Sequence, residues 1–501
     1  MMQKSLTLGA LACVAAAMLA GCGGSGGSNM SGTSAGSSAQ SAPVFLMGTD
    51  APLPSVVSFQ VTINSVTLSN GGSNGVNILS APQTVDFGRY NGLQTLLDFN
   101  SIPAGTYNTV TVSLSAPSIA TLTLGSGGAA SITPVPNVTL MNSTPVVQLS
   151  QPFTVTAGQA IGLKMDFDLR QSLLTDSTGQ ITGEVNPTLD FKALTPNTPD
   201  AEIDEFYATV TSVNTSQNTF MVQGPHGHQY TVALNQANTG SGATTTEWDD
   251  NGDESGNSQG GNNGQINLAS LVPNQTIVDL AGEFQPNTQT LDATDVAIIS
   301  QSGFYAGGTV TTVNPMTGPA NTFQMYVRSL LPTSTGLQVG QLATVQLTGN
   351  EKFFVFRRHS PLLQFLFNSS LMIPGQHVSI GGPASGAANA SAVSVRRVVL
   401  HLSGISGHIV AGSVNTADNS FLLVPDGLDG YLLSKGNPTA NPVRVYLTGE
   451  TRYRGGFSSM DDVANDGSSL VRVVGLVLND PMTGKPLVVG RYMDKTPNGG
   501  E

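Results

Sequence analysis

Residues 304–314 read FYAGGTVTTVN, and this stretch is the clearest of three related copies along the chain. The stretch combines aromatic residues, threonine and valine and ends at an asparagine, which predicts a β-strand that leads into a turn. The segments 206–214 (FYATVTSVN) and 405–415 (ISGHIVAGSVN) repeat the pattern at spacings of roughly 100 residues. Each copy ends at an asparagine and is soon followed by NTF or NSF, so each unit is predicted to open with a β-hairpin.

A second motif repeats farther along the units. Residues 347–353 read LTGNEKF, and residues 447–453 read LTGETRY. We therefore predict three β repeat units, at 203–300, 303–401 and 404–497, each long enough to hold its own core. The units resemble domain-of-unknown-function family 5666, found in bacterial envelope proteins. The resemblance implies small β-barrel-like units of the OB type.

The region 42–195 is predicted to form a separate antiparallel β-sandwich. Residues 56–68, 106–114 and 163–169 each alternate apolar and polar side chains. In the first of these, the apolar phase shifts near Asn64 and Ser65, which indicates a β-bulge. One short helix is expected around 93–97. The fold class is thus all-β: a sandwich followed by three barrels.

Several motifs of this region fall in the order of one known family. They are GTDAP (48–52), VTINSVTL (61–68), IPAGTY (102–107), MDFD (165–168) and NPTL (186–189). Together they resemble domain-of-unknown-function family 4382, found in bacterial lipoproteins. The IPAGTY turn is also similar to transthyretin-like sandwiches. The resemblance implies no catalytic residue, because no activity is established for the family.

The first 21 residues are predicted to be a lipoprotein signal peptide. Lys4 is followed by an uncharged apolar stretch, 6–20, and then by LAGC at 19–22. This ending resembles the bacterial lipobox, which implies that Cys22 is lipidated and becomes the first residue after cleavage. Residues 22–41, rich in glycine and serine, form a flexible tether. Gly23 in place of an aspartate favours the outer membrane of a bacterial cell envelope.

The charge balance limits the partners. The chain has 19 basic and 32 acidic residues and a formal net charge of −13, which argues against nucleic acid as a partner. The expected partners are the membrane, through the N-terminal lipid, and a glycan or an envelope protein. Only 10% of the residues are charged, so the strands use serine, threonine and asparagine on their polar faces.

Two clusters of oxygen-bearing side chains have spacings that suit calcium. They are Asp249, Asn251 and Asp253 in the first repeat, and Asp461, Asp462 and Asp466 in the third. The first cluster departs from a complete calcium loop, since Glu254 stands at the position of the loop glycine. A solvated acidic loop is the alternative for both clusters. Calcium is the one cofactor that the sequence suggests.

A basic group in the second repeat is the candidate ligand-binding surface. It consists of Arg357, Arg358, Arg396 and Arg397, with aromatic residues nearby at 353–356. Arginine beside exposed aromatic rings suits an acidic glycan or a lipid headgroup. The alternative is that the rings belong to the core and the arginines form a solvated rim.

The leading hypothesis is a non-enzymatic, lipid-anchored envelope protein that acts as a binding or scaffolding module. The six histidines are scattered along the sequence and offer no catalytic constellation by their spacing. His226 and His228 lie in a probable hairpin turn without a third ligand nearby. A calcium-stabilised adhesion module and, further off, a metal-assisted hydrolase are the alternatives.

Overall fold

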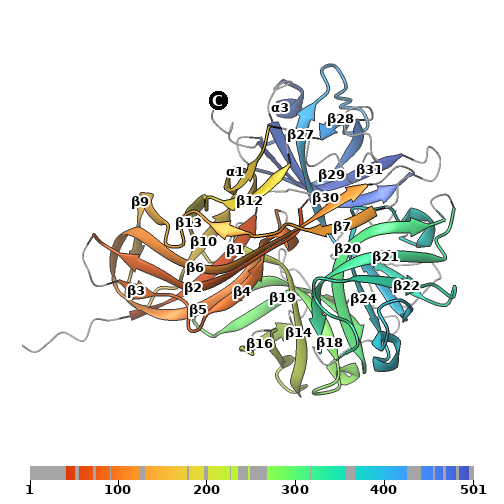
Figure 1. Cartoon of the computed structure of the whole chain (residues 1–501). Coiled ribbons are helices and arrows are strands. Elements are labelled where there is room, and N and C mark those ends of the chain that lie inside the picture. Colours follow the sequence, from red (N-terminus) through yellow and green to blue (C-terminus); the bar gives the residue numbers. More distant parts are fainter. Residues whose placement is uncertain are drawn as a thin grey trace, which may run out of the picture. The chain divides into compact units, whose positions relative to one another are not determined.

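The computed structural model describes most of the chain after the N-terminal segment (Figure 1). The described residues are 41–50, 56–71, 75–90, 92–124, 130–177, 180–196, 201–225, 227–234, 246–248, 268–315, 318–332, 335–356, 367–425, 442–454, 457–465, 470–480 and 485–495. They form an almost entirely β structure, which confirms the all-β prediction. Among them, no helix has the length and apolar character needed to cross a membrane.

Two sheets form the N-terminal sandwich. The first has the order β13-β10-β1-β5, and the second is built around β2 and β6, with β3, β4, β7 and β9 alongside. The strands of the first sheet are β1 (Ser41–Asp50), β5 (Thr95–Pro103), β10 (Ile161–Phe167) and β13 (Leu189–Leu194). Those of the second are β2 (Val56–Ser69), β3 (Val76–Asn77), β4 (Gln83–Asp86), β6 (Gly105–Leu124), β7 (Ala130–Pro134) and β9 (Val146–Val155).

The sandwich core follows the predicted alternation. Val61, Ile63, Val66 and Leu68 of β2 are buried, and the β2–β6 register shifts between Ile63 and Ser65, which confirms the predicted bulge. The pairing is not wholly antiparallel, because β1 and β10 run parallel. The helix expected at 93–97 was wrong: these residues lead into β5, whose pairing with β1 outweighs local helix propensity.

A small third sheet and a few short helices complete this region. The sheet has the order β11-β12-β8 and consists of β8 (Thr139–Leu140), β11 (Leu173–Thr175) and β12 (Ile181–Val185). The helices here are η1 (Phe87–Arg89) and α1 (Leu169–Ser172). The Asp168 side chain accepts a hydrogen bond from the Gln171 backbone N–H and caps α1. The η1 turn is buried, which brings Arg89 into the interior.

The first repeat forms a sheet whose ends meet. Its order is β16-β15-β14-β18-β19-β17, and β16 also pairs with β19 in parallel. The elements are β14 (Glu202–Asn214), β15 (Thr219–Gln223), β16 (Gln229–Leu234), β17 (Glu247–Trp248), η3 (Leu268–Ser270), β18 (Ile277–Gln285) and β19 (Thr290–Ser300). The opening hairpin is the one that the repeated motif predicts.

The second repeat has the same strand neighbours but remains an open sheet, β23-β26-β24-β20-β21-β22-β25. Its elements are β20 (Phe304–Asn314), β21 (Thr322–Leu331), β22 (Leu342–Gln346), β23 (Lys352–Val355), η5 (Ser369–Leu371), β24 (His377–Gly382), η6 (Ala384–Ala387), β25 (Val393–Ser394) and β26 (Arg397–Leu400). The last strand is divided: β25 pairs with β22, whereas β26 pairs with β24.

The third repeat is a closed five-stranded barrel, β27-β28-β29-β31-β30. It contains β27 (Ser403–Ile409), β28 (Ser420–Pro425), β29 (Val443–Arg454), α3 (Met460–Asn465), β30 (Leu470–Asn479) and β31 (Pro486–Lys495), drawn in blue in Figure 1. The parallel pairing of β29 with β31 closes it. This order, with the third and fifth strands side by side, is that of OB-type barrels.

The units share parts of their cores. Phe45 and Met47 of the sandwich pack with Phe206 and Phe284 of the first barrel. In another cluster, Tyr492 of the third barrel packs with core residues of the second repeat. Shared burial of this kind couples the units, since separating them would expose apolar surface to water.

Closure of the third barrel depends on glycine at position 475. A Cβ there would lie 2.2 Å from the Val489 carbonyl oxygen, so Gly475→Ala is expected to destabilise the protein by about 1–3 kcal/mol. Gly449→Ala is the matched control, because a Cβ there meets nothing within 4 Å. Urea unfolding followed by circular dichroism measures both, and equal stability of the two variants would contradict the expectation.

Candidate functional site

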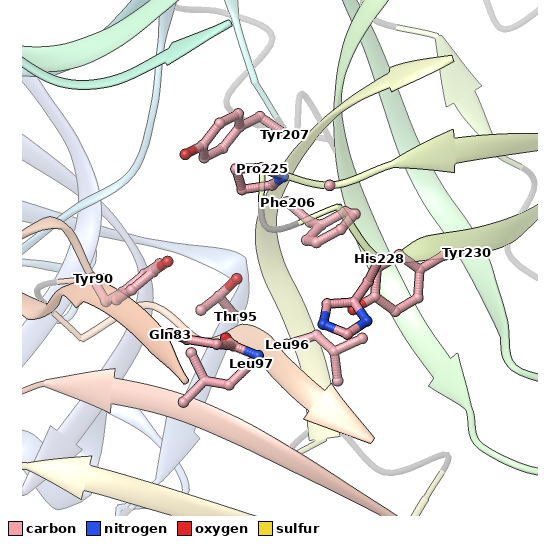
Figure 2. A pocket seen from close by; sticks show the side chains of 11 residues that line it. Gln83, Tyr90, Thr95, Leu96, Leu97, Phe206, Tyr207, Pro225, His228 and Tyr230 are labelled. Atoms are coloured by element: carbon pink, nitrogen blue, oxygen red, sulfur yellow. The ribbon is translucent and has the colours of Figure 1, made fainter. Parts of the chain in front are cut away.

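A pocket lies where the sandwich meets the first barrel (Figure 2). The sandwich supplies residues 83, 90 and 95–97, from β4, the turn after η1, and β5. The first barrel supplies residues 206–207 of β14 and the β15–β16 turn with Tyr230. The hollow has an empty volume of ≈ 410 Å³, its open mouth included.

Four of the eleven residues that line the pocket are Phe or Tyr. Phe206 and Tyr230 are buried and meet edge to face, with ring centroids 5.2 Å apart. Tyr90 and Tyr207 are partly exposed. Figure 2 places the His228 ring beside Tyr230, and His228 Nε2 lies 3.5 Å from Ser80 Oγ. Burial raises the pKa of Tyr90 to about 12, so its phenol remains protonated and can donate a hydrogen bond.

Arg89 lies next to the pocket. Its guanidinium is 4.2 Å from the Tyr207 ring centroid and 5.7 Å from that of Tyr90, which are cation–π distances. Its Nη2 donates a hydrogen bond of 2.6 Å to Glu205 Oε1, and both side chains are almost fully buried. Arg89 therefore connects two aromatic residues of the pocket to a buried polar cluster.

We define the buried cluster as Glu205, Asp279, His377, His401 and Ser379. The Ser379 hydroxyl lies 2.7 Å from His401 Nε2, which is also 3.6 Å from Asp279 Oδ2. On the other side, His401 Nδ1 is 4.0 Å from Glu205 Oε1, and His377 Nδ1 is 3.6 Å from Glu205 Oε2. The two imidazole rings lie 5.0 Å apart.

Burial shifts every pKa in the cluster. It lowers the pKa of His377 to about 3 and that of His401 to about 4, although Glu205 opposes both shifts. Burial and the neighbouring Glu205 raise the pKa of Asp279 well above its usual range. For Glu205, burial is the largest single influence and favours the neutral form. The charges of Arg89, His377 and His401 and the hydrogen bond from Arg89 together outweigh it, so the pKa falls well below its ordinary value. Near neutral pH, Glu205 and Arg89 are thus the ionised pair.

The order Ser379, His401, Glu205 resembles a nucleophile relay in its residue types. However, the Ser379 side chain has 0% exposure, so its hydroxyl cannot meet a substrate from solvent. The geometry accordingly suits a buried structural or ion-binding role.

The start of β14 joins this cluster to the other units. Glu202 Oε2 accepts a hydrogen bond of 2.6 Å from Arg452 of the third barrel, and Tyr492 also contacts it. The Asp204 carboxylate accepts a hydrogen bond from the Gln94 backbone N–H of the sandwich at 3.0 Å and one from the Tyr492 hydroxyl at 3.1 Å. Glu205 faces Arg89 of the sandwich and His377 of the second repeat. Three acidic residues of one strand thus contact all the other units.

The predicted calcium clusters are only partly described. Asp249, Asn251, Asp253 and Asp466 lie outside the described residues. Asp461 is exposed near the start of α3. Asp462 Oδ2 accepts hydrogen bonds from the backbone N–H groups of Ser458 and Ser459 and from the Ser458 hydroxyl. The Asp462 N–H in turn points to Ser459 Oγ at 3.4 Å, so this pair forms a capping box for α3.

The predicted basic group is also only partly described, because Arg357 and Arg358 lie outside the described residues. Cys22, the predicted lipidation site, lies outside them as well. Arg396 and Arg397 line a hollow together with 299–302 and 381–382, at the junction of the first two repeats. Arg397 donates a hydrogen bond to the Ile298 carbonyl. Phe356 belongs to the buried core, which favours the core alternative for that ring.

Two of the histidines, His377 and His401, lie together in the structure, although they are 24 positions apart in the sequence. His377 is the first residue of β24, and His401 comes directly after β26, the strand that pairs with β24. The His401 backbone N–H donates a hydrogen bond to the His377 carbonyl. The signal available in the sequence was the pair of hydrophobic strands 377–382 and 397–400, whose antiparallel register places the two histidines opposite each other. The contribution of Glu205 and Arg89 depends on contacts between units, which spacing along the chain does not reveal.

The comparisons with known proteins bear on the N-terminal part. Residues 41–183 match the model of a domain of unknown function, DUF4382. The match covers most of the sandwich and confirms the resemblance drawn from its motifs. No curated protein matches the chain.

The buried histidines predict acid sensitivity. The unfolded chain binds protons at both imidazoles below about pH 6.5, whereas the folded cluster excludes them until pH 3–4. Stability should therefore fall as the pH decreases from 6.5 to 5. Asp279 opposes this trend, because its raised pKa lets the folded state hold one extra proton. The two unfolded imidazoles together bind about one proton at pH 6.5, which Asp279 offsets, and about two near pH 5. The net loss of stability therefore grows from about zero to about 1.4 kcal/mol per pH unit over this range.

Urea unfolding at several pH values in EDTA measures this slope. The double variant His377→Gln, His401→Gln is expected to flatten or reverse it. His408→Gln, at an exposed position of β27, is the control and should retain it. A wild-type protein that is equally stable at pH 6.5 and 5 would rule out the proposed linkage.

Proposed function

We propose that the protein is a non-enzymatic, lipid-anchored protein of the bacterial cell envelope that binds a glycan in the aromatic pocket. The pocket between the sandwich and the first barrel is the observation that carries this proposal. It combines aromatic faces with a few polar groups, the composition typical of small-ligand sites.

The chemistry of the pocket suits a sugar. The apolar C–H face of a pyranose packs against an aromatic ring such as that of Tyr90, while its hydroxyls need hydrogen-bonding partners. Gln83, Thr95 and His228 supply such groups around the same hollow.

The surroundings keep the pocket in shape. Its two walls come from different units, and Arg89 links them through Glu205. The Thr95 hydroxyl donates to the Glu205 carbonyl at 3.1 Å and adds a second link. A pocket ordered before the ligand arrives loses less entropy on binding. The order of the pocket before binding supports the proposal that the protein is a binding module.

The cellular placement rests on the sequence. In this proposal, Cys22 carries the lipid, residues 22–41 form the tether, and the protein resides at the outer membrane. The three repeat units, which resemble domain-of-unknown-function family 5666, act as the rigid scaffold beside the sandwich.

Glycan binding is tested with the full-length chain. We expect a panel of neutral and acidic bacterial oligosaccharides to include a ligand that the wild type binds in isothermal titration calorimetry. Tyr90→Leu and His228→Ala should each weaken that binding by about tenfold or more, which corresponds to about 1.4 kcal/mol. Tyr446→Leu, in β29 of the third barrel, should bind as the wild type does.

The proposal fails if no oligosaccharide binds, or if the pocket variants bind like the wild type although circular dichroism shows them folded. Recovery of a cleaved oligosaccharide would instead indicate an enzyme.

Anchoring is tested separately at Cys22. Mass spectrometry of the mature N-terminus should show an acylated cysteine, and Cys22→Ser should abolish the modification and move the protein from the membrane fraction to the soluble fraction. Retention of Cys22→Ser in the membrane would contradict a lipid anchor at this position.

A further inference from the structure

Three ionisable side chains of the buried cluster converge on one point. Glu205 and Asp279 come from β14 and β18, and His401 follows β26 of the second repeat. One metal-binding atom from each lies within 4.8 Å of the other two. The Asp279 Oδ2–His401 Nε2 and Glu205 Oε1–His401 Nδ1 distances are 3.6 and 4.0 Å. These two distances run to different nitrogens of the His401 ring. Ligands of one tetrahedral ion lie about 3.4 Å apart, so the carboxylates must move toward a single ring nitrogen when one ion is bound.

The same three residues carry buried atoms without a hydrogen-bond partner. These atoms are Glu205 Oε2, Asp279 Oδ1 and His401 Nδ1. All three side chains are at most 2% exposed. A buried polar atom left unsatisfied is costly, and native structures usually supply a partner for it. A cation bound among them would satisfy the carboxylate and imidazole lone pairs together.

We propose that Glu205, Asp279 and His401 bind a divalent transition-metal ion, with zinc as the representative ion, at the junction of the first and second repeats. Ser379 Oγ, 2.7 Å from His401 Nε2, holds the ring so that Nδ1 is available to the ion. This is the arrangement by which neighbouring groups orient metal-binding histidines.

Arg89 selects the class of ion. Its guanidinium occupies Glu205 Oε1 and leaves Oε2 available to a metal. The positive charge beside the site disfavours ions held mainly by electrostatic attraction, such as calcium and magnesium. An imidazole ligand favours zinc and similar ions, whose bonds to nitrogen are strong. The site thus differs in chemistry from the calcium clusters suggested by the sequence.

The experiment measures zinc retained by the full-length chain. The protein is stripped with EDTA, equilibrated with Zn²⁺, dialysed and analysed by inductively coupled plasma mass spectrometry. We expect about one tightly held zinc per chain, and a rise in melting temperature on zinc addition. Asp279→Asn and His401→Gln should each lose this zinc, whereas His408→Gln should keep it.

Wild-type protein that retains no zinc would overturn the proposal. Equal retention by the wild type and the two ligand variants would also overturn it, because the ion would then lie elsewhere. If the ligand variants do not fold, zinc retention by the wild-type protein alone decides the test. Co²⁺ should give visible d–d absorption bands of a site with nitrogen and oxygen ligands, and Zn²⁺ should remove them. Absence of these bands in the folded wild type would count against the site.

Discussion

The structure depends on one short acidic stretch that is buried where all four β units meet. Glu202, Asp204 and Glu205 begin the first strand of the first barrel, and all three are at most 4% exposed. Burial of carboxylates is tolerated only when charge and hydrogen bonds compensate for lost hydration. The partners come from elsewhere in the chain: Arg89 and Gln94 from the sandwich, and Arg452 with Tyr492 from the third barrel.

This constraint also places the candidate sites. Because Glu205 must meet Arg89, the buried η1 turn lies against β14, and Tyr90 and Tyr207 then line one pocket on either side of the guanidinium. On the opposite side of Glu205 lie His377 and His401. The pocket and the buried cluster therefore share the Arg89–Glu205 pair. A substitution of either residue would affect both the pocket and the cluster.

The sequence predicted the fold better than the site. Hydrophobic alternation and the repeated hairpin motif indicated the all-β class and the opening hairpins of the repeats, because both signals are local, whereas the barrel form was expected only from the family resemblance. The bulge in β2 was also visible as a shift of the apolar phase near Ser65. By contrast, the 202–205 stretch reads as a polar linker between two domains, and its burial follows only from long-range contacts. The acidic cluster around Asp462 suggested calcium, yet this carboxylate caps α3, a role that its spacing to Ser459 also indicates.

The contacts of Glu202 have a consequence for how the chain acquires its structure. Arg452 and Tyr492 follow it by 250 and 290 positions. Contacts this distant in sequence form slowly, because a long loop must close before they contribute stability. During synthesis, the sandwich and the first barrel emerge well before their last charge partners do. The contacts at this junction therefore cannot all form until the third barrel has been synthesised. The rigidity of the N-terminal half thus depends on the C-terminal barrel.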